Sequence, residues 1–212
     1  MEGVLTNCRS TGGDGFAFVI QNDTPTALGT PGGLGLGYDG IENSIAVEFD
    51  TYFNHEALDP YENHISVHTR GWRHPNSSNH TYSIGHTNAV QMLTDGRLKG
   101  RIKYIPLFDI EILSSSSFVA SPHILSFFEN NDFHQGGDSD WNKAGLGVLS
   151  VYLENMDVPV LSVPLHLSAT LNLNRGRAYV GFTAATGAET HQSHEIYSWY
   201  FNSLRMDPLE PS

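Results

Sequence analysis

Residues 46–64, with the sequence AVEFDTYFNHEALDPYENH, decide how the rest of the chain is interpreted. Successive side chains of a strand point to opposite faces, so Glu48 and Asp50 share one face while Val47 and Phe49 share the other, which faces a core. Two carboxylates on one pleated face repel each other unless a cation lies between them. The stretch therefore predicts a strand, a loop and a returning strand that together form a metal site.

The loop and the returning strand supply further metal ligands. Asn54 and Asp59 lie in the loop, and the returning strand has His64 in phase with Ser66 and His68. This spacing predicts one strand pair with an apolar inner face and a ligand-bearing outer face. The alternative interpretation is an acidic loop that is simply solvated and binds no metal.

The ligand types indicate two kinds of ion. Hard oxygen ligands suit calcium, and the candidates are Asp50, Asn54, Asp59 and a loop carbonyl. A single imidazole among carboxylates suits a divalent transition metal, and the candidates are Glu48, Asp50, Asp59 and His64. Asp50 and Asp59 appear in both sets, so they could bridge the two ions.

Composition limits the class of protein. The 212 residues are enough for one domain with a sizeable core, and 11 basic against 23 acidic side chains give a formal charge of −12. Such a chain is not expected to bind nucleic acid phosphates or to insert into membranes. Charged residues make up only 16% of the chain and glycine is abundant, which favours a sheet protein with many turns.

Neither a disulfide nor a targeting segment is indicated. Cys8 is the only cysteine, so the fold must depend on core packing and bound metal. No apolar stretch is long enough to span a bilayer. Residues 1–5 lack the basic and apolar blocks of a signal peptide.

The hydrophobic pattern predicts an all-β, antiparallel sandwich in one domain, residues 1–202, followed by a tail at 203–212. Residues 16–20 form a continuous apolar run, which predicts a strand buried on both faces. The other predicted strands are 65–69, 81–85, 98–105, 147–153, 158–165, 178–184 and 194–201, with a stub at 4–6. Residues 108–144 fit no regular pattern and are interpreted as an insertion.

A glycine-rich cluster at residues 31–37 is not a phosphate-binding loop, because no Lys-Ser/Thr pair and no helix pattern follow it. Glycines here instead allow backbone amides to approach a ligand or another strand closely.

Four motifs in order resemble a known family. They are residues 13–18 (GDGFAF), 32–35 (GGLG), 47–65 (VEFDTY with the later Asn54, Asp59-Pro60 and His64-Ile65), and 180–201 (VGFTAATGAE with HEI and SWYF). Together they are similar to the legume-type (L-type) lectin domain of the concanavalin A-like lectin and glucanase superfamily. The resemblance implies a jelly-roll sandwich with a flat back sheet, a curved front sheet and sugar-binding loops at one rim.

The resemblance assigns metal ligands to matched positions. It implies a transition metal, usually manganese, bound by Glu48, Asp50, Asp59 and His64. It implies calcium bound by Asp50, Asn54, Asp59 and the backbone carbonyl of Tyr52.

The resemblance also assigns sugar-binding roles. Asp14, preceded by a cis peptide bond, would accept hydrogen bonds from two sugar hydroxyls, and the amide of Gly32 or Gly33 would donate to the sugar; a count from Asp14 without gaps favours Gly32. Three further roles are implied: an amide donor, a ring that stacks on the sugar, and a loop that tunes specificity. They fall on Asn54, on Tyr52, and on Ala188 with Glu189, respectively.

The resemblance implies glycans or glycoproteins as partners, homo-oligomers, and a secreted or secretory-pathway protein. Two departures accompany it. The family has several strands before the Gly-Asp-Gly motif, whereas this sequence has only a dozen residues there, and residues 108–144 have no counterpart in plant lectins. The sandwich is therefore expected to lack the family's first strands.

Two other functions remain open. Laminarinase-type glycoside hydrolases share this sandwich, and Glu48-Phe49-Asp50 begins like their catalytic strand. The next residues on that face are Tyr52 and Asn54, however, so no third carboxylate follows in phase. A structural or interaction module that lost sugar binding is the other alternative, and the presence of Asp14, Asn54 and Tyr52 disfavours it.

Overall fold

The computed structural model describes residues 3–5, 12–94, 96–107, 146–173, 176–188 and 191–203. Several predictions of the sequence fall outside these residues. They concern Cys8, the insertion at 108–144, Glu189 and nearly all of the tail at 203–212.

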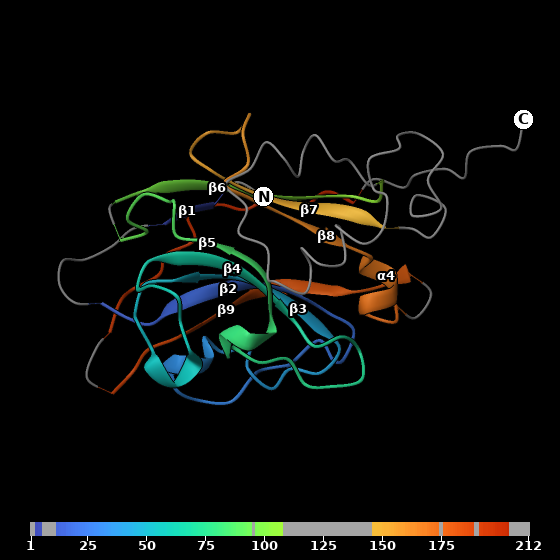
Figure 1. Ribbon diagram of the computed structural model, residues 1–212, viewed down its shortest axis with the longest axis horizontal. Helices are drawn as coiled ribbons and strands as arrows, with labels where there is room; N and C mark the ends of the chain where they lie inside the picture. Colours follow the sequence, from blue (N-terminus) through green and yellow to red (C-terminus); the bar gives the residue numbers. More distant parts are fainter. Residues whose placement is uncertain are drawn as a thin grey trace, which may run out of the picture.

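Two antiparallel sheets pack face to face (Figure 1). The five-stranded sheet has the order β5-β4-β3-β2-β9, with bounds Ser83–Thr87, His64–Thr69, Ser44–Asp50, Gly15–Gln21 and Tyr179–Ala185. The four-stranded sheet has the order β1-β6-β7-β8, with bounds Gly3–Leu5, Leu98–Ile105, Gly147–Leu153 and Leu161–Leu165. Among the described residues the helices are short, namely η1 (Gly33–Gly35), η2 (His55–Ala57), η3 (His80–Tyr82) and α4 (Leu167–Thr170). The predicted all-β antiparallel sandwich is confirmed.

The main core lies between the two sheets. From the five-stranded sheet it includes Phe16, Val47, Phe49 and Val67, which occupy alternate positions of β2, β3 and β4. The rings of Phe16 and Phe49 stack with centroids 4.7 Å apart, and these two residues are register partners across β2 and β3. The period-two alternation in the sequence therefore determines which face of each strand is apolar.

The opposite face of the five-stranded sheet is covered by loops rather than by solvent, as the lower half of Figure 1 shows. A second apolar cluster lies there, in which Tyr38 and Leu36 of the glycine-rich loop pack on Ala17, Val19 and Ala46 of β2 and β3. All but one of the seven residues of β2 are buried, which confirms the prediction of a strand buried on both faces.

The predicted strand at 194–201 is wrong, since residues 191–203 contain no strand. The alternation of rings that suggested it is used for side-chain contacts instead. His194 packs on Phe16 at 5.4 Å between centroids, and Trp199 meets Phe182 of β9 edge-on at 5.7 Å. Aromatic packing of this kind needs no hydrogen-bonded ladder.

The remaining strands match their predicted positions within a few residues. The largest shift is in β8, which begins at Leu161 rather than at residue 158. Within the described ranges, no helix has the length and apolarity needed to cross a bilayer.

Candidate functional site

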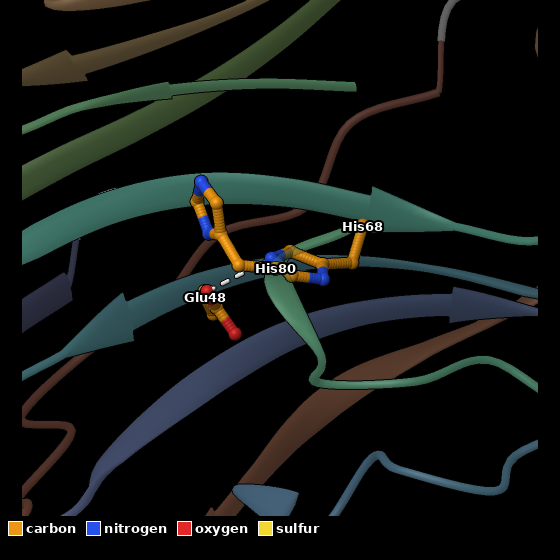
Figure 2. Close-up of side chains that lie close together, drawn as sticks. All are labelled: Glu48, His68 and His80. Atoms are coloured by element: carbon orange, nitrogen blue, oxygen red, sulfur yellow. Dashed lines mark ion pairs between the residues drawn. The ribbon is translucent and has the colours of Figure 1, made fainter. Parts of the chain in front are cut away.

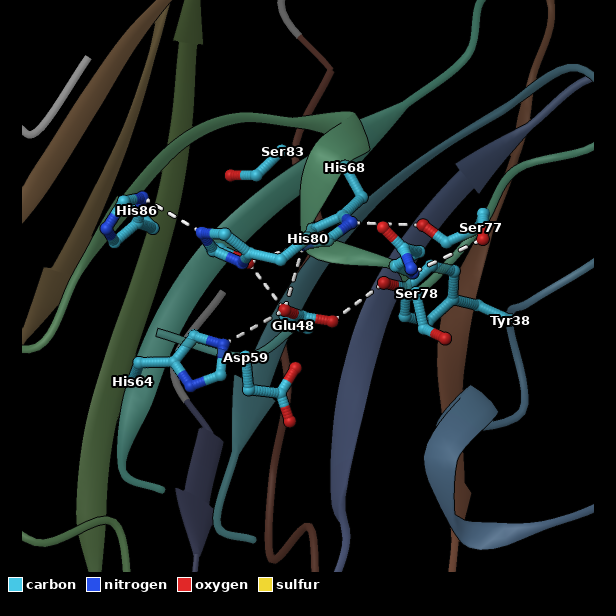
Figure 3. A network of polar contacts seen from close by, with 12 residues as sticks. Tyr38, Glu48, Asp59, His64, His68, Ser77, Ser78, His80, Ser83 and His86 are labelled. Atoms are coloured by element: carbon cyan, nitrogen blue, oxygen red, sulfur yellow. Dashed lines mark hydrogen bonds and ion pairs between the residues drawn. The ribbon is translucent and has the colours of Figure 1, made fainter. Parts of the chain in front are cut away.

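The site centres on Glu48 in β3, whose side chain lies on the outer face of the five-stranded sheet under the loops (Figure 3). Glu48 is 1% exposed, yet its carboxylate is fully partnered. Tyr38 Oη donates to its Oε2 at 2.7 Å, and Ser66 Oγ donates to its Oε1. The Nε2 atoms of His64 and His68 lie 3.2 and 2.9 Å from the same Oε1.

The histidines keep Glu48 charged. Burial acts to raise the pKa of Glu48, but the charges and hydrogen bonds of His68 and His64 outweigh burial and hold the pKa well below its usual range. Burial acts to lower the pKa of His64, but Glu48 outweighs it and raises that pKa. The Nδ1 of His64 lies 2.7 Å from the carbonyl oxygen of Tyr61, so Nδ1 carries the proton and Nε2 faces Glu48.

The predicted ligands Asp50 and Asp59 are buried carboxylates that repel one another. Burial, then the charges of Glu48 and Asp59, raise the pKa of Asp50 well above its usual range. Burial raises the pKa of Asp59 to about 6. Each accepts one backbone donor: Tyr52 N–H donates to Asp50 Oδ1 at 2.8 Å, and Asn54 N–H donates to Asp59 Oδ2 at 2.6 Å.

The residues present fit the implied metal ions. Ligand atoms of Glu48, Asp50 and His64 all lie within 4.8 Å of one another, and all three residues are buried. Asp59 is outside that group of three but close enough to Asp50 to raise its pKa. Buried carboxylates at such separations are usual where a cation lies between them. The oxygen and nitrogen donors have the chemistry that calcium and a divalent transition metal prefer.

Asp14 lies at the end of the site near the start of β2. The Gly13–Asp14 peptide bond is cis, as the family resemblance implied. The backbone of Asp14 is fixed on both sides, because its N–H donates to Ala185 O at 3.1 Å and its carbonyl accepts from Thr51 N at 2.8 Å. Its carboxylate accepts from Asn54 Nδ2 at 3.4 Å and from the backbone of Gly187, whereas Oδ1 is buried without a hydrogen-bond partner.

Of the two adjacent glycines, Gly33 and not Gly32 lies against the carboxylate of Asp14. A Cβ atom at Gly33 would lie 2.2 Å from Asp14 Oδ1, so no side chain fits there, whereas a Cβ at Gly32 would meet nothing within 4 Å. The count without gaps had favoured Gly32. Of the two predicted amide donors, the structure therefore puts Gly33 against the carboxylate.

Two other predicted sugar-binding residues, Tyr52 and Ala188, are the chain neighbours of Thr51 and Gly187, which donate hydrogen bonds to Asp14. Tyr52 is half-buried at the end of β3, and Ala188 is exposed in the loop that follows β9. A cavity of about 270 Å³ adjoins this region. It is lined by Gly32 together with η2 and residues 77–79, but not by Asp14. The cavity therefore lies beside the predicted sugar site, on the side of Gly32, and does not include the Asp14 carboxylate.

Sequence reasoning missed three features of the site. Tyr38 comes from the glycine-rich loop, and its hydrogen bond to Glu48 had no signal in the local pattern. Gln192 is buried and accepts from Thr51 Oγ1 at 2.9 Å, behind Asp14. His68, in phase with His64, was placed on the correct face, but its contact with Glu48 was not predicted.

Residues 4–105 and 138–211 match the model of the legume lectin domain. The chain belongs to this family. The match passes over residues 106–137, a range that overlaps most of the predicted insertion. Membership supports carbohydrate binding by this legume lectin domain and confirms the resemblance on which the site residues were assigned.

Two curated relatives and one solved structure are similar to this chain. The probable L-type lectin-domain containing receptor kinase S.7 of Arabidopsis thaliana is 28% identical over 220 residues, covering 94% of this chain and 24% of the relative. The L-type lectin-domain containing receptor kinase V.9 of the same plant is 25% identical over 211 residues, covering 93% and 25%. The chain thus spans about a quarter of the length of these relatives.

The structural relative is a peanut lectin described with the nonapeptide PVIWSSATG. It is 20% identical, has a TM-score of 0.54, and the match covers 92% of this chain and 66% of the peanut lectin chain. This likeness supports the fold.

Proposed function

We propose that this legume lectin domain binds glycans at a shallow rim site around Asp14, and that calcium together with manganese or another divalent transition metal holds the site in shape. The observation that carries the proposal is the buried Oδ1 of Asp14, a carboxylate oxygen without a hydrogen-bond partner. Sugar hydroxyl donors would satisfy it.

The groups around Asp14 suit a neutral sugar. Asn54 supplies an amide donor within 3.4 Å of the carboxylate, and Gly33 allows a backbone to lie directly against it. Tyr52 supplies a ring for the apolar face of a pyranose, while Ala188 and Glu189 form the specificity loop. Each such hydrogen bond contributes only about 1 kcal/mol net, so affinity depends on a rigid arrangement.

The metal ions would supply that rigidity. Asp50, Asn54, Asp59 and the Tyr52 carbonyl would bind calcium, while Glu48, Asp50, Asp59 and His64 would bind the transition metal. Asn54 and Tyr52 belong to both the calcium set and the sugar set. A bound calcium ion would therefore fix the two residues that approach the sugar.

We assign no catalysis to this site. Glu48, which aligned with the start of a glucanase-like strand, is 1% exposed and fully occupied by Tyr38, Ser66 and two histidines. A glycosidase needs a carboxyl pair that straddles an accessible glycosidic bond. A place in the secretory pathway fits the family, and glycoproteins there would be the partners.

A glycan array tests the proposal, with the full chain probed in calcium and manganese and again after chelation. We expect binding in the metals and its loss after chelation. Asp14→Asn should reduce binding about tenfold to hundredfold, since it removes hydrogen bonds to a charged group. Asp23→Asn, at an exposed carboxylate, is the matched control and should bind as the wild type does.

Binding that persists unchanged in Asp14→Asn would overturn the site assignment. Release of reducing sugar from β-glucans by the wild-type chain would contradict the non-catalytic part of the proposal.

A further inference from the structure

A cluster of histidines lies beside the implied metal site and plays no part in it. Glu48, His68 and His80 bring ligand atoms within 4.8 Å of one another. Figure 2 shows the three side chains converging from β3, β4 and η3. His68 and His80 were not among the predicted ligands, which include only His64 of the chain's 11 histidines.

The ring of His68 is oriented as in a metal ligand. Its Nδ1 lies 3.0 Å from the carbonyl oxygen of Ser77, which can only accept, so Nδ1 carries the proton. Nε2 is therefore the nitrogen that faces Glu48 Oε1, 2.9 Å away, and a metal ion bound there would replace its proton. A backbone carbonyl that holds the distal ring nitrogen is the usual partner of a ligating histidine.

The ring of His80 has one nitrogen without a partner. Its Nε2 lies 3.1 Å from Nδ1 of His86, while its own Nδ1 is buried and makes no hydrogen bond. A buried polar atom without a partner costs free energy. When Nε2–H of His80 donates to His86, Nδ1 has a lone pair that a cation would accept, which removes that cost. Figure 3 shows the ring lying above Glu48.

We propose that Glu48, His68 and His80 form a second transition-metal site, distinct from the set of Glu48, Asp50, Asp59 and His64, with Glu48 shared between the two. Two imidazoles and one carboxylate are a ligand set that zinc accepts readily and that calcium does not favour. The ligand atoms lie within 4.8 Å of one another, so adjustment of the side chains alone would bring them to the spacing of a zinc site.

Metal at this site would tie a loop to the sheet. His80 belongs to η3, and the carbonyl that orients His68 belongs to Ser77. The same loop thus supplies one ligand and holds the ring of another. Glu48 and His68 are fixed on strands of the sheet. Because residues 77–79 also line the cavity beside the rim, the ion would brace one wall of that cavity.

The test is calorimetric titration of zinc into the chelator-stripped full chain, with calcium and manganese then held in excess. We expect one equivalent of zinc that manganese does not displace. His80→Gln and His68→Gln should each weaken it by at least about tenfold. His74→Gln, at an exposed position of the same loop, is the matched control and should keep it. His80 is only partly buried, so its variant should fold even if the fully buried His68→Gln does not.

Two further arms separate this proposal from the function proposed above. Asp59→Asn should lose the calcium and manganese ions but keep the zinc equivalent. Cobalt in place of zinc should give a visible absorption band that disappears in His80→Gln. Zinc stoichiometry unchanged in both His80→Gln and His68→Gln, or zinc displaced one for one by manganese, would overturn the proposal, whatever the outcome of the glycan array.

Discussion

Within β3 and β4, the two faces of the five-stranded sheet are about equally buried but differ in chemistry. On the inner face Val47, Phe49 and Ile65 pack into an apolar core, whereas on the outer face Glu48 and His64 are just as inaccessible. Adjacent residues of β3 thus lie in two different buried environments, one apolar and one polar and charged. The inner face is stabilised by removing apolar area from water, which requires nothing from solution. The outer face buries carboxylates and histidines, and its net charge depends on how many of them are protonated and, as proposed, on bound cations.

The largest expected effect lies on the inner face. Phe49→Ala removes a ring that is 2% exposed and stacked on Phe16, so it should lower the free energy of unfolding by about 3–5 kcal/mol. The loss should be equal in calcium and in chelator, as measured by urea denaturation. Phe53→Ala, at a side chain that is 47% exposed, is the control and should change stability little. A loss that depends on metal would break the distinction between the two faces.

A smaller effect is expected on the outer face. Tyr38→Phe removes the hydroxyl that donates to Glu48 and leaves Oε2 buried without that partner, at a cost of about 1–3 kcal/mol. The shape of the ring is unchanged, so the apolar packing of the loop should survive. Urea denaturation measures the cost, with Tyr179→Phe at an exposed hydroxyl as the control. Wild-type stability in Tyr38→Phe would mean that the hydrogen bond to Glu48 contributes nothing.

The smallest expected effect is a gradual change of calcium affinity with pH. Burial raises the pKa of Asp59 to about 6, so the carboxylate that would bind calcium is protonated below that pH. Apparent calcium affinity should fall as pH drops through 6, by up to roughly tenfold per pH unit for each proton released on binding. Calorimetry between pH 5 and pH 7.5 measures this, and a flat profile would contradict the raised pKa.

The same carboxyl group predicts the opposite trend without metal. The folded chain holds the proton of Asp59 more tightly than the unfolded chain does, because its pKa rises from 3.8 to about 6. The contribution of this group to stability is therefore present below pH 3.8 and is lost as pH rises to about 6. Comparison with Asp59→Asn in chelator isolates it from the other titrating groups.

The sequence predicted the parts of the molecule that depend on strand periodicity. Alternation alone placed Glu48 and Asp50 opposite Val47 and Phe49, and it put His64 in phase with His68. It could not reveal that loops bury the outer face, because contacts such as Tyr38 with Glu48 join segments whose approach depends on tertiary packing.

The sequence failed where one pattern is compatible with two structures. Alternating rings at 194–201 predicted a strand, but the same spacing lets Trp199 pack on Phe182 without backbone pairing. Adjacent glycines were equally ambiguous, since only the position of the Asp14 carboxylate distinguishes Gly33 from Gly32. His80 and His86 lie in and after an aperiodic loop, so their contact had no signal in the spacing.

Calcium calorimetry on the chelator-stripped wild type and on Asp59→Asn tests the central claim most directly. Asp59→Asn keeps an oxygen that accepts from Asn54 N–H but removes the charge. We predict saturable calcium binding in the wild type and in Asp157→Asn, a control at an exposed carboxylate, and none in Asp59→Asn, with all three chains folded. Equal binding by Asp59→Asn, or no binding by the wild type, would contradict the account of the outer face as a scaffold for cations.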